Sequence, residues 1–152
     1  MTVPIKTKNI IAENTLKLTL DISHTNFRFR PGQYLRLGLP SLADRPITDQ
    51  FHAFSIASSS RNHQTLRLIF RLSDSIFKQT INTLQPGNEV IIEGPLGIFT
   101  LPHHIKQPIV MLAGGIGVAP FLSILHTLRG RPSHTVTLYY FNVSKETAAC
   151  LY

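Results

Sequence analysis

Residues 111–125 read MLAGGIGVAPFLSIL, and this stretch decides how the second half of the chain folds. The apolar run 109–113 predicts a buried strand, and the glycines of 114–117 predict a tight turn after it. Pro120 suits the first turn of a following helix, where its missing N–H removes no hydrogen bond. A helix that begins on such a turn presents free N–H groups and a positive dipole end to a phosphate. The alternative is a buried strand, turn and helix without a ligand.

The surrounding segment 108–125 carries no charge and is long enough to raise the question of a membrane-spanning helix. Its clustered glycines, its central proline and its strand-like beginning argue against that interpretation. We therefore expect no membrane span.

Composition limits the class of protein. With 152 residues, 43% of them hydrophobic, the chain can form a packed core in one domain or slightly more. Fifteen Lys and Arg residues against eight Asp and Glu give a net charge of +7, which suits an anionic ligand, a nucleic acid or an acidic partner. Cys150 is the only cysteine, which excludes a disulfide framework within one chain. Without an apolar signal segment at the N-terminus, we expect a reducing, cytoplasmic setting.

Alternation of apolar and polar residues predicts half-buried strands before residue 102. The segments with this alternation, or with a short apolar run, are 16–22, 27–30, 35–39, 51–57, 66–72 and 90–92. One helix, capped by Asp74 and ended by the sequence QPG at 85–87, interrupts them. Short strands with one late helix predict a closed antiparallel barrel over residues 1–102.

A different pattern follows the boundary at 102–108. The strand 109–113, a helix at about 120–128 and a strand at 136–141 form one βαβ unit with a parallel pair of strands. Ser144 could cap a second helix.

Two polar clusters could carry chemistry. In the sequence HAFS at 52–55, Phe54 could lie against a flat heterocycle, Ser55 could hydrogen-bond a ring nitrogen, and His52 could meet a phosphate. The alternative is a plain strand with Phe54 in the core and His52 on the surface. Arg71 and Lys78 could pair with phosphates, or they could simply be solvated.

Other chemistry finds little support. The sequence GPLG at 94–97 could let a group approach the backbone, or it could be an ordinary turn. The seven histidines lack the spacing of metal ligands, so we expect no metal. No nucleophile stands beside a suitable base, and no pair of carboxylates stands out, so hydrolysis is unsupported.

Four motifs occur in a specific order. They are FRPGQY at 29–34, HAFS at 52–55, LQPG at 84–87 followed by VIIEGPLGIF at 90–99, and AGGIGVAP at 113–120. Together they resemble the ferredoxin–NADP reductase superfamily, and HAFS is most similar to the ferric reductase and NADPH oxidase branch. The resemblance runs from about residue 16 to residue 141.

The resemblance implies a six-stranded antiparallel Greek-key barrel at 1–102 that binds FAD, with one helix. A partial parallel βαβ domain at 108–152 would receive NADH or NADPH. FAD is favoured over FMN only because the branch uses it. Hydride would pass from the nicotinamide to the flavin, and electrons would leave singly to an acceptor that the sequence does not identify. The cofactor supplies the hard chemistry, and the protein supplies position and electrostatics.

The resemblance also implies residue roles. Ser55 would be the catalytic residue, near the reactive ring nitrogen, and a helix beginning near Ser75 would point at the pyrophosphate. The implied cofactor-binding residues are His52, Ala53, Phe54, Ser55, Ile69, Phe70, Arg71, Phe77, Lys78, Gly94, Gly97, Gly114, Gly115, Ile116, Gly117 and Pro120.

Three departures from the family pattern lead to a hypothesis. His52 replaces an arginine, the start of the helix at Ser75 lacks the usual glycine, and one βαβ unit stands where the family has a larger sheet. We therefore expect a truncated or split reductase that keeps flavin binding and exposes an apolar surface.

Two alternatives stay open. The chain could be a flavin-binding electron-transfer module that takes its nucleotide domain from a partner chain. It could instead be a basic barrel that binds nucleic acid, but alternation places the aromatics and arginines of 27–30 on opposite faces. We therefore expect a pyridine nucleotide as partner and no nucleic acid.

Overall fold

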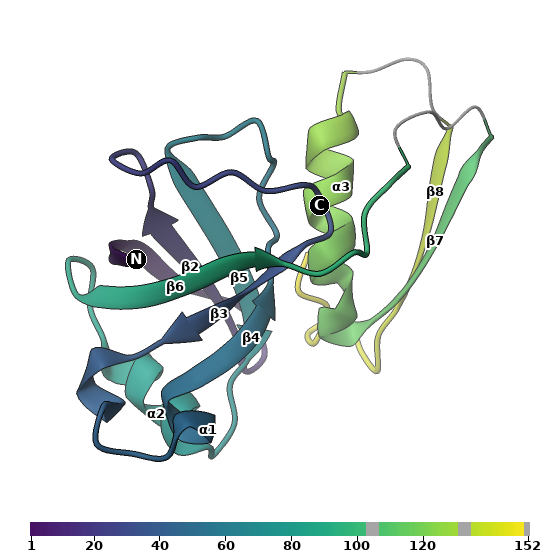
Figure 1. Cartoon of the computed structure of the whole chain (residues 1–152). Helices are drawn as coiled ribbons and strands as arrows, with labels where there is room; N and C mark the ends of the chain where they lie inside the picture. The colour runs from purple at the N-terminus through teal and green to yellow at the C-terminus, as the bar shows by residue number, and fades with distance from the viewer. Residues whose placement is uncertain (103–106, 131–134, 151–152) are drawn as a thin grey trace.

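A six-stranded antiparallel sheet and a two-stranded parallel sheet lie on opposite sides of one helix (Figure 1). The computed structural model describes residues 1–102, 107–130 and 135–150. The strands are β1 (Thr2–Ala12), β2 (Thr15–Asp21), β3 (Tyr34–Gly38), β4 (Phe51–Ser55), β5 (Thr65–Arg71), β6 (Glu89–Leu96), β7 (Ile109–Gly114) and β8 (Val136–Phe141). The helices are α1 (Ile47–Gln50), α2 (Ile76–Thr83) and α3 (Ala119–Leu128), with 3₁₀ turns η1 (Pro40–Leu42) and η2 (Gly115–Val118).

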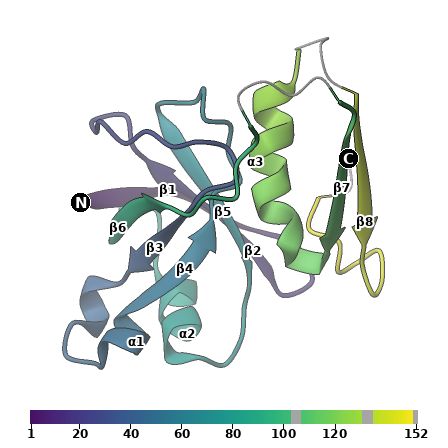
Figure 2. The same ribbon diagram turned by 45° about the vertical axis from the view of Figure 1, so that its right-hand side comes forward.

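The large sheet curls into a barrel with the strand order β4-β3-β6-β1-β2-β5 (Figure 2). All its pairs are antiparallel, and β6 lies between β3 and β1, which confirms the Greek-key arrangement. Its outermost strands, β4 and β5, approach each other at a single bridge, between Ile56 and Leu68, where the Ala57 N–H donates to the Arg67 carbonyl. The barrel is therefore slit along the line between β4 and β5, rather than fully closed as the alternation suggested.

Alternate side chains of the strands fill the inside of the barrel, as period-two patterning predicts. Leu16, Leu18 and Leu20 of β2 are no more than 1% exposed, and they face Leu66 and Leu68 of β5 across the strand pair. The polar residues between them lie on the outer face. Burial of these branched side chains holds the barrel together.

Two segments differ from the sequence-based expectation. The strand β1 was missed because its alternation stops after Ile5 and its register shifts twice, after Ile5 and after Ile10. The segment 27–30 forms no strand, although its alternation suggested one. None of the described strands pairs with it. Side chains hold this loop instead: Thr25 accepts from the N–H of Phe27, and Gln33 accepts from that of Arg30.

Three local predictions are also corrected. Ser75, not Asp74, caps α2, because its side chain accepts a hydrogen bond from the N–H of Lys78. The residues of 94–96 belong to β6 and do not form a turn, since Leu96 pairs with Tyr34. No helix begins at Ser144, because the chain turns there and Thr147 donates its hydroxyl to the Ser144 carbonyl.

The helix α3 connects the two halves of the molecule, lying between the barrel and the β7–β8 sheet (Figures 1 and 2). Its Ser123 hydroxyl donates to the Ser58 carbonyl at 2.8 Å, and both residues are fully buried. The adjacent strands β7 and β8 run parallel, with Met111 opposite Leu138. This strand–helix–strand unit confirms the predicted partial nucleotide-binding fold, whereas a domain boundary at 102–108 stays a prediction.

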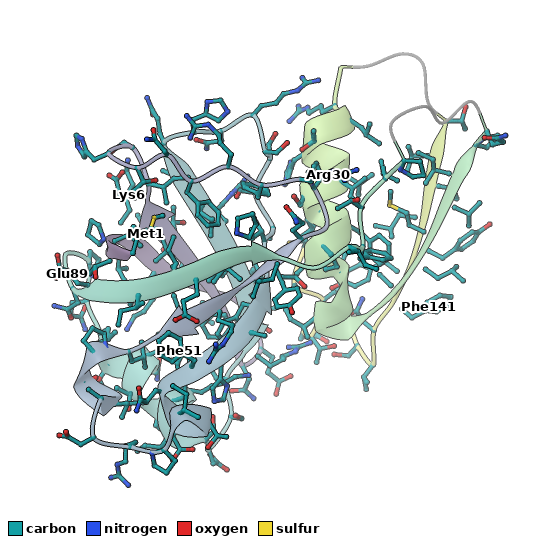
Figure 3. The ribbon with its side chains drawn as sticks, viewed as in Figure 1. Met1, Lys6, Arg30, Phe51, Glu89 and Phe141 are labelled. Atoms are coloured by element: carbon teal, nitrogen blue, oxygen red, sulfur yellow. The ribbon has the colours of Figure 1, made fainter. Side chains whose placement is uncertain are left out.

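Only one face of the β7–β8 sheet is covered. Met111 and Ala113 are buried, whereas Val110, Leu112, Tyr139 and Phe141 are more than half exposed. Figure 3 shows Phe141 on the side of the sheet that faces away from α3. In the part of the chain that is described, no helix is long and apolar enough to cross a membrane.

Candidate functional site

The slit between β4 and β5 exposes two strand edges. Along most of their length, β4 pairs only with β3, and β5 pairs only with β2. The two strands are joined only at the Ile56–Leu68 bridge, where the Ala57 N–H donates to the Arg67 carbonyl. Alternate residues of an antiparallel strand direct their backbone groups to opposite sides. The N–H of Ile56 donates toward β3, so those of Ala53 and Ser55 face the slit.

The same reasoning applies to β5. The Arg67 carbonyl accepts a hydrogen bond from Ala57 across the slit, whereas the Leu72 N–H donates to Asn14 on the side of β2. Because the direction alternates along the strand, the backbone groups of Ile69 and Arg71 face the slit, as those of Arg67 do.

The Ile56–Leu68 bridge joins the Ser55 carbonyl to the Ile69 N–H, because the Ile56 N–H already donates to Gln33. Two short rows of backbone groups without ladder partners therefore remain: both groups of Ala53 and the N–H of Ser55 on one edge, and the Ile69 carbonyl and the Arg71 N–H on the other. Such rows suit a planar heterocycle with several hydrogen-bonding atoms on its rim.

Aromatic rings fill the floor of the slit. The ring of Phe54 lies 4.5 Å from that of Phe70, and the ring of His52 stacks on Phe77 with centroids 4.2 Å apart. Phe77 is supplied by α2, which packs beneath the strands, and its side chain is fully buried. The structure thus brings four predicted site residues together. Phe54 is itself largely covered by its neighbours, however, so its ring face is less open than the sequence suggested.

A positive charge stands at one end of the slit. Lys78 donates through Nζ to the Arg71 carbonyl, and Nζ lies 5.7 Å from the centroid of the Phe70 ring. Partial burial lowers the pKa of Lys78 from its usual value. Since Lys78 sits in the first turn of α2, its ammonium group and the free N–H groups of that turn are close together and suit a phosphate.

A polar cavity of about 440 Å³ continues from this point. It is lined by Asn14, Leu72, Ser73, Asp74, Lys78, Gln79 and Asn82. Asn14 belongs to the β1–β2 hairpin and Asn82 to the far end of α2, so sequence reasoning had no periodic pattern that could place them here. Ser75, which caps α2, lies one position after Asp74, the cap that the sequence predicted.

The charge on His52 differs from the sequence-based expectation. Burial lowers the pKa of this histidine, and the positive charge of Lys78 lowers it further, while Asp49 acts in the opposite direction. At neutral pH the ring is therefore less often cationic than an exposed histidine.

Arg71 points away from the slit. Its guanidinium donates to the carbonyls of Glu13 and Thr147 and to the Thr15 hydroxyl. It thereby ties β5 to the β1–β2 hairpin and to the C-terminal segment. A role in binding phosphate stays a prediction, and Lys78 is the better-placed cation.

The glycine turn opens beside the end of β5. A Cβ added at Gly114, Gly115 or Gly117 would meet no atom within 4 Å, and Gly115 has a φ of +49°. Ile116 packs against the cluster that contains Ala57 and Ile69. The turn therefore leaves its backbone open to a ligand while it stays anchored to the barrel.

A cavity of about 350 Å³ joins this turn to the end of β5. Arg71, Gly115, Asn142 and Thr147 are among its lining residues. Pro120 stands in the first turn of α3, as its sequence position predicts. A ligand at the glycine turn would thus lie beside the strand that borders the slit.

Gly94 and Gly97 lie elsewhere. A Cβ at Gly94 would come within 3.2 Å of Leu35 Cβ, and one at Gly97 would come within 2.9 Å of the Tyr34 ring. These two glycines let β6 pack closely on β3. Since β3 lies between β6 and β4 in the sheet, the glycines are one strand removed from the edge of β4. Their role in cofactor binding stays a prediction. In the described part of the chain, no three His, Cys, Asp or Glu side chains come together as metal ligands.

Comparison with known proteins identifies relatives of both halves. A family profile described as an FAD-binding domain matches residues 1–100. The anthranilate 1,2-dioxygenase electron transfer component of Acinetobacter baylyi is 30% identical over 145 residues, which cover 93% of this chain and 40% of that protein. The toluate 1,2-dioxygenase electron transfer component of Pseudomonas putida is 33% identical over 120 residues, or 78% of this chain and 34% of that protein.

A solved structure agrees with these matches. The Amycolatopsis cytochrome P450 reductase has a TM-score of 0.84 and 27% identity, and the match covers 99% of this chain and 45% of that one. The chain thus spans two fifths or less of the length of the two curated relatives. The ferric reductase branch stays a prediction.

Proposed function

Because this chain belongs to the FAD-binding domain family of the ferredoxin–NADP reductase type, we propose that the slit between β4 and β5 binds FAD. We further propose that the chain carries the flavin of an oxidoreductase that takes electrons from NADH or NADPH. The observation that supports this most is the pair of facing strand edges above an aromatic floor. A bound flavin supplies hydride acceptance and the release of single electrons.

The residues present fit such a cofactor. The backbone groups of Ala53, Ser55 and Ile69 would hydrogen-bond the rim of the ring system. Its phosphates would lie near Lys78 and the first turn of α2. The polar cavity beside Asn14 offers room for the adenosine part.

Ser55 is the candidate for the catalytic position. It ends β4 at the slit, and its hydroxyl has no hydrogen bond to any residue that the structure describes. A hydroxyl so placed can donate a hydrogen bond to a ring nitrogen and hold its proton in position during hydride transfer. The pyridine nucleotide would approach from the open glycine turn.

The electron acceptor would be a partner protein. Both curated relatives are electron transfer components of dioxygenases, and a chain with a net charge of +7 suits an acidic partner. The cytoplasmic setting stays a prediction.

An absorption spectrum of the purified protein, recorded after FAD is added and the excess removed, tests the flavin site. We expect the bands of a bound oxidised flavin in the wild type. Lys78→Met should weaken FAD binding by about tenfold, since a charge-assisted phosphate contact is lost. Lys6→Met, which changes a half-exposed lysine paired with Asp21 at the opposite end of β2, is the control. A wild type that retains no flavin, or equal affinities for all three proteins, would contradict the assignment.

A second candidate function is favoured by the exposed face of the β7–β8 sheet. The chain would then be a flavin module that receives hydride only when a further protein segment completes this sheet. Anaerobic addition of NADH or NADPH distinguishes the two. Bleaching of the bound flavin supports the reductase, and a bound flavin that stays oxidised supports the module.

A further inference from the structure

A further pocket lies between the outer surface of the barrel and α3. Its volume is about 290 Å³, just below the range of small-molecule pockets, which is about 300–1,000 Å³. Strands β2 and β5 form one wall, and α3 forms the other (Figure 1). Ile11, Ile69 and Leu122 give this space an apolar lining.

Three basic side chains also line this cavity. Lys17 of β2 lies opposite Ile69 of β5, and Arg67 precedes Ile69 by two residues on the same face, so the two cations are diagonal neighbours. Like charges so close on one sheet face repel each other. His126 reaches the cavity from α3. Burial lowers the pKa of this histidine, and the positive charge of Arg67 lowers it further.

Within the described residues, no carboxylate lines the cavity, and no carboxylate forms an ion pair with Lys17 or Arg67. The sole cysteine, Cys150, borders the same space. Burial raises the pKa of its thiol, while the charges of Lys17 and Arg67 act against this rise. The positive charges of both strands therefore reach the inside of the cavity.

We propose that this cavity binds a small organic anion with one anionic head and an apolar body. The head lies between Lys17 and Arg67, where it removes their mutual repulsion. The body lies against Ile69 and Leu122, which shield it from water. Arg67 and Ile69 border the slit through their backbone and this cavity through their side chains, whereas Lys17, Leu122 and His126 have no part in the slit.

Cys150 provides the measurement, because a ligand in the cavity covers the only thiol of the chain. The rate at which this thiol reacts with a disulfide reagent is followed at fixed pH while hexanoate, acetate or hexanamide is added. Hexanoate should slow the reaction saturably. Acetate lacks the apolar body and hexanamide lacks the charge, so each should require a concentration at least about tenfold higher.

Variants locate the bound head. Lys17→Gln and Arg67→Gln should each raise the hexanoate concentration for half-protection by about tenfold. Arg61→Gln, which changes an exposed arginine outside the cavity, should leave it unchanged. The variants are compared by the hexanoate concentration that gives half-protection and not by the reaction rate of the thiol, because removing a cation also changes the pKa of Cys150.

Amide chemical shifts of the ¹⁵N-labelled protein provide a readout that is independent of the thiol. Hexanoate should shift the signals of Ile69 and Leu122, and the spectra also establish whether each variant is folded. Absence of both protection and shifts in the wild type would overturn the proposal. Equal protection by acetate would mean an adventitious ion only, and unchanged half-protection in both folded variants would overturn the position of the head.

Discussion

At the scale of single residues, His52 makes the stability of the protein depend on pH. Its folded pKa lies below the ordinary value of 6.5, because burial and Lys78 disfavour the imidazolium. The unfolded chain therefore binds more protons near pH 6 than the folded one, so the free energy of unfolding falls as the pH falls. Urea unfolding of the flavin-free protein at about pH 7.5 and about pH 5.5 should show this loss.

The variant His52→Gln should lose less stability over the same interval. His126, whose pKa is also lowered, keeps its own contribution in this variant. His63→Gln, at an exposed position in the β4–β5 connection, serves as the control and should behave as the wild type does. A drop of the same size in His52→Gln and the wild type would contradict the role of His52.

At this scale the sequence predicted a group of side chains that the structure brings together, although their role in binding a cofactor stays a prediction. His52 and Phe54 come from the motif HAFS, and Phe77 and Lys78 are among the residues that the family resemblance implies. What the sequence could not give is the direction of each side chain. Arg71 turns to backbone carbonyls of distant segments, and the contacts of a long, flexible side chain depend on tertiary neighbours.

At the scale of elements, one lysine ties the first strand to the barrel helix. Lys8 of β1 donates to the carbonyls of Asn82 and Leu84 at the C-terminal end of α2. Two charge-assisted bonds at a helix C-terminus stabilise that end, so Lys8→Met should lower the free energy of unfolding by about 1–3 kcal/mol. Urea unfolding at neutral pH measures the change.

Lys6 provides a matched control on the same strand. It forms a partly exposed ion pair with Asp21 at 3.6 Å, a kind of contact that contributes about 0–1 kcal/mol. Lys6→Met should therefore have the smaller effect. Equal effects of the two substitutions would mean that the helix-end contact has no special role.

The elements that failed prediction did so for local reasons. Alternation predicts which face of a strand is buried, but it does not predict whether a partner strand is present. The loop at 27–30 has the alternation without a partner, and β1 has partners on both sides without sustained alternation. The cap of α2 was off by one residue, because Asp74 and Ser75 are both good N-cap residues.

At the scale of the whole molecule, the open face of the β7–β8 sheet should govern association. Val110, Leu112, Tyr139 and Phe141 form a largely uncharged surface that a protein normally covers. We expect the chain to self-associate as its concentration rises. Leu112→Lys should shift this association to a concentration about tenfold higher, as sedimentation velocity can measure.

Ile10→Lys is the comparison, because Ile10 is 60% exposed but belongs to β1. It should leave association unchanged. A chain that stays monomeric at all concentrations would refute the role of this face, and equal effects of the two lysines would refute its position.

The slit in the barrel has a further consequence, for the order in which the protein comes apart. Opening the barrel along this line breaks one bridge, whereas separating β2 from β5 breaks seven paired positions. Thermal fluctuations should therefore open the sheet here first, and the amide hydrogens of Ala53 and Ser55, which have no ladder partner, should exchange with solvent ahead of those in the paired strands. A molecule that binds both strand edges joins them across the slit. It would raise the melting temperature by stabilising the folded state, by about 2.7 kcal/mol at a concentration of about 100 times its Kd.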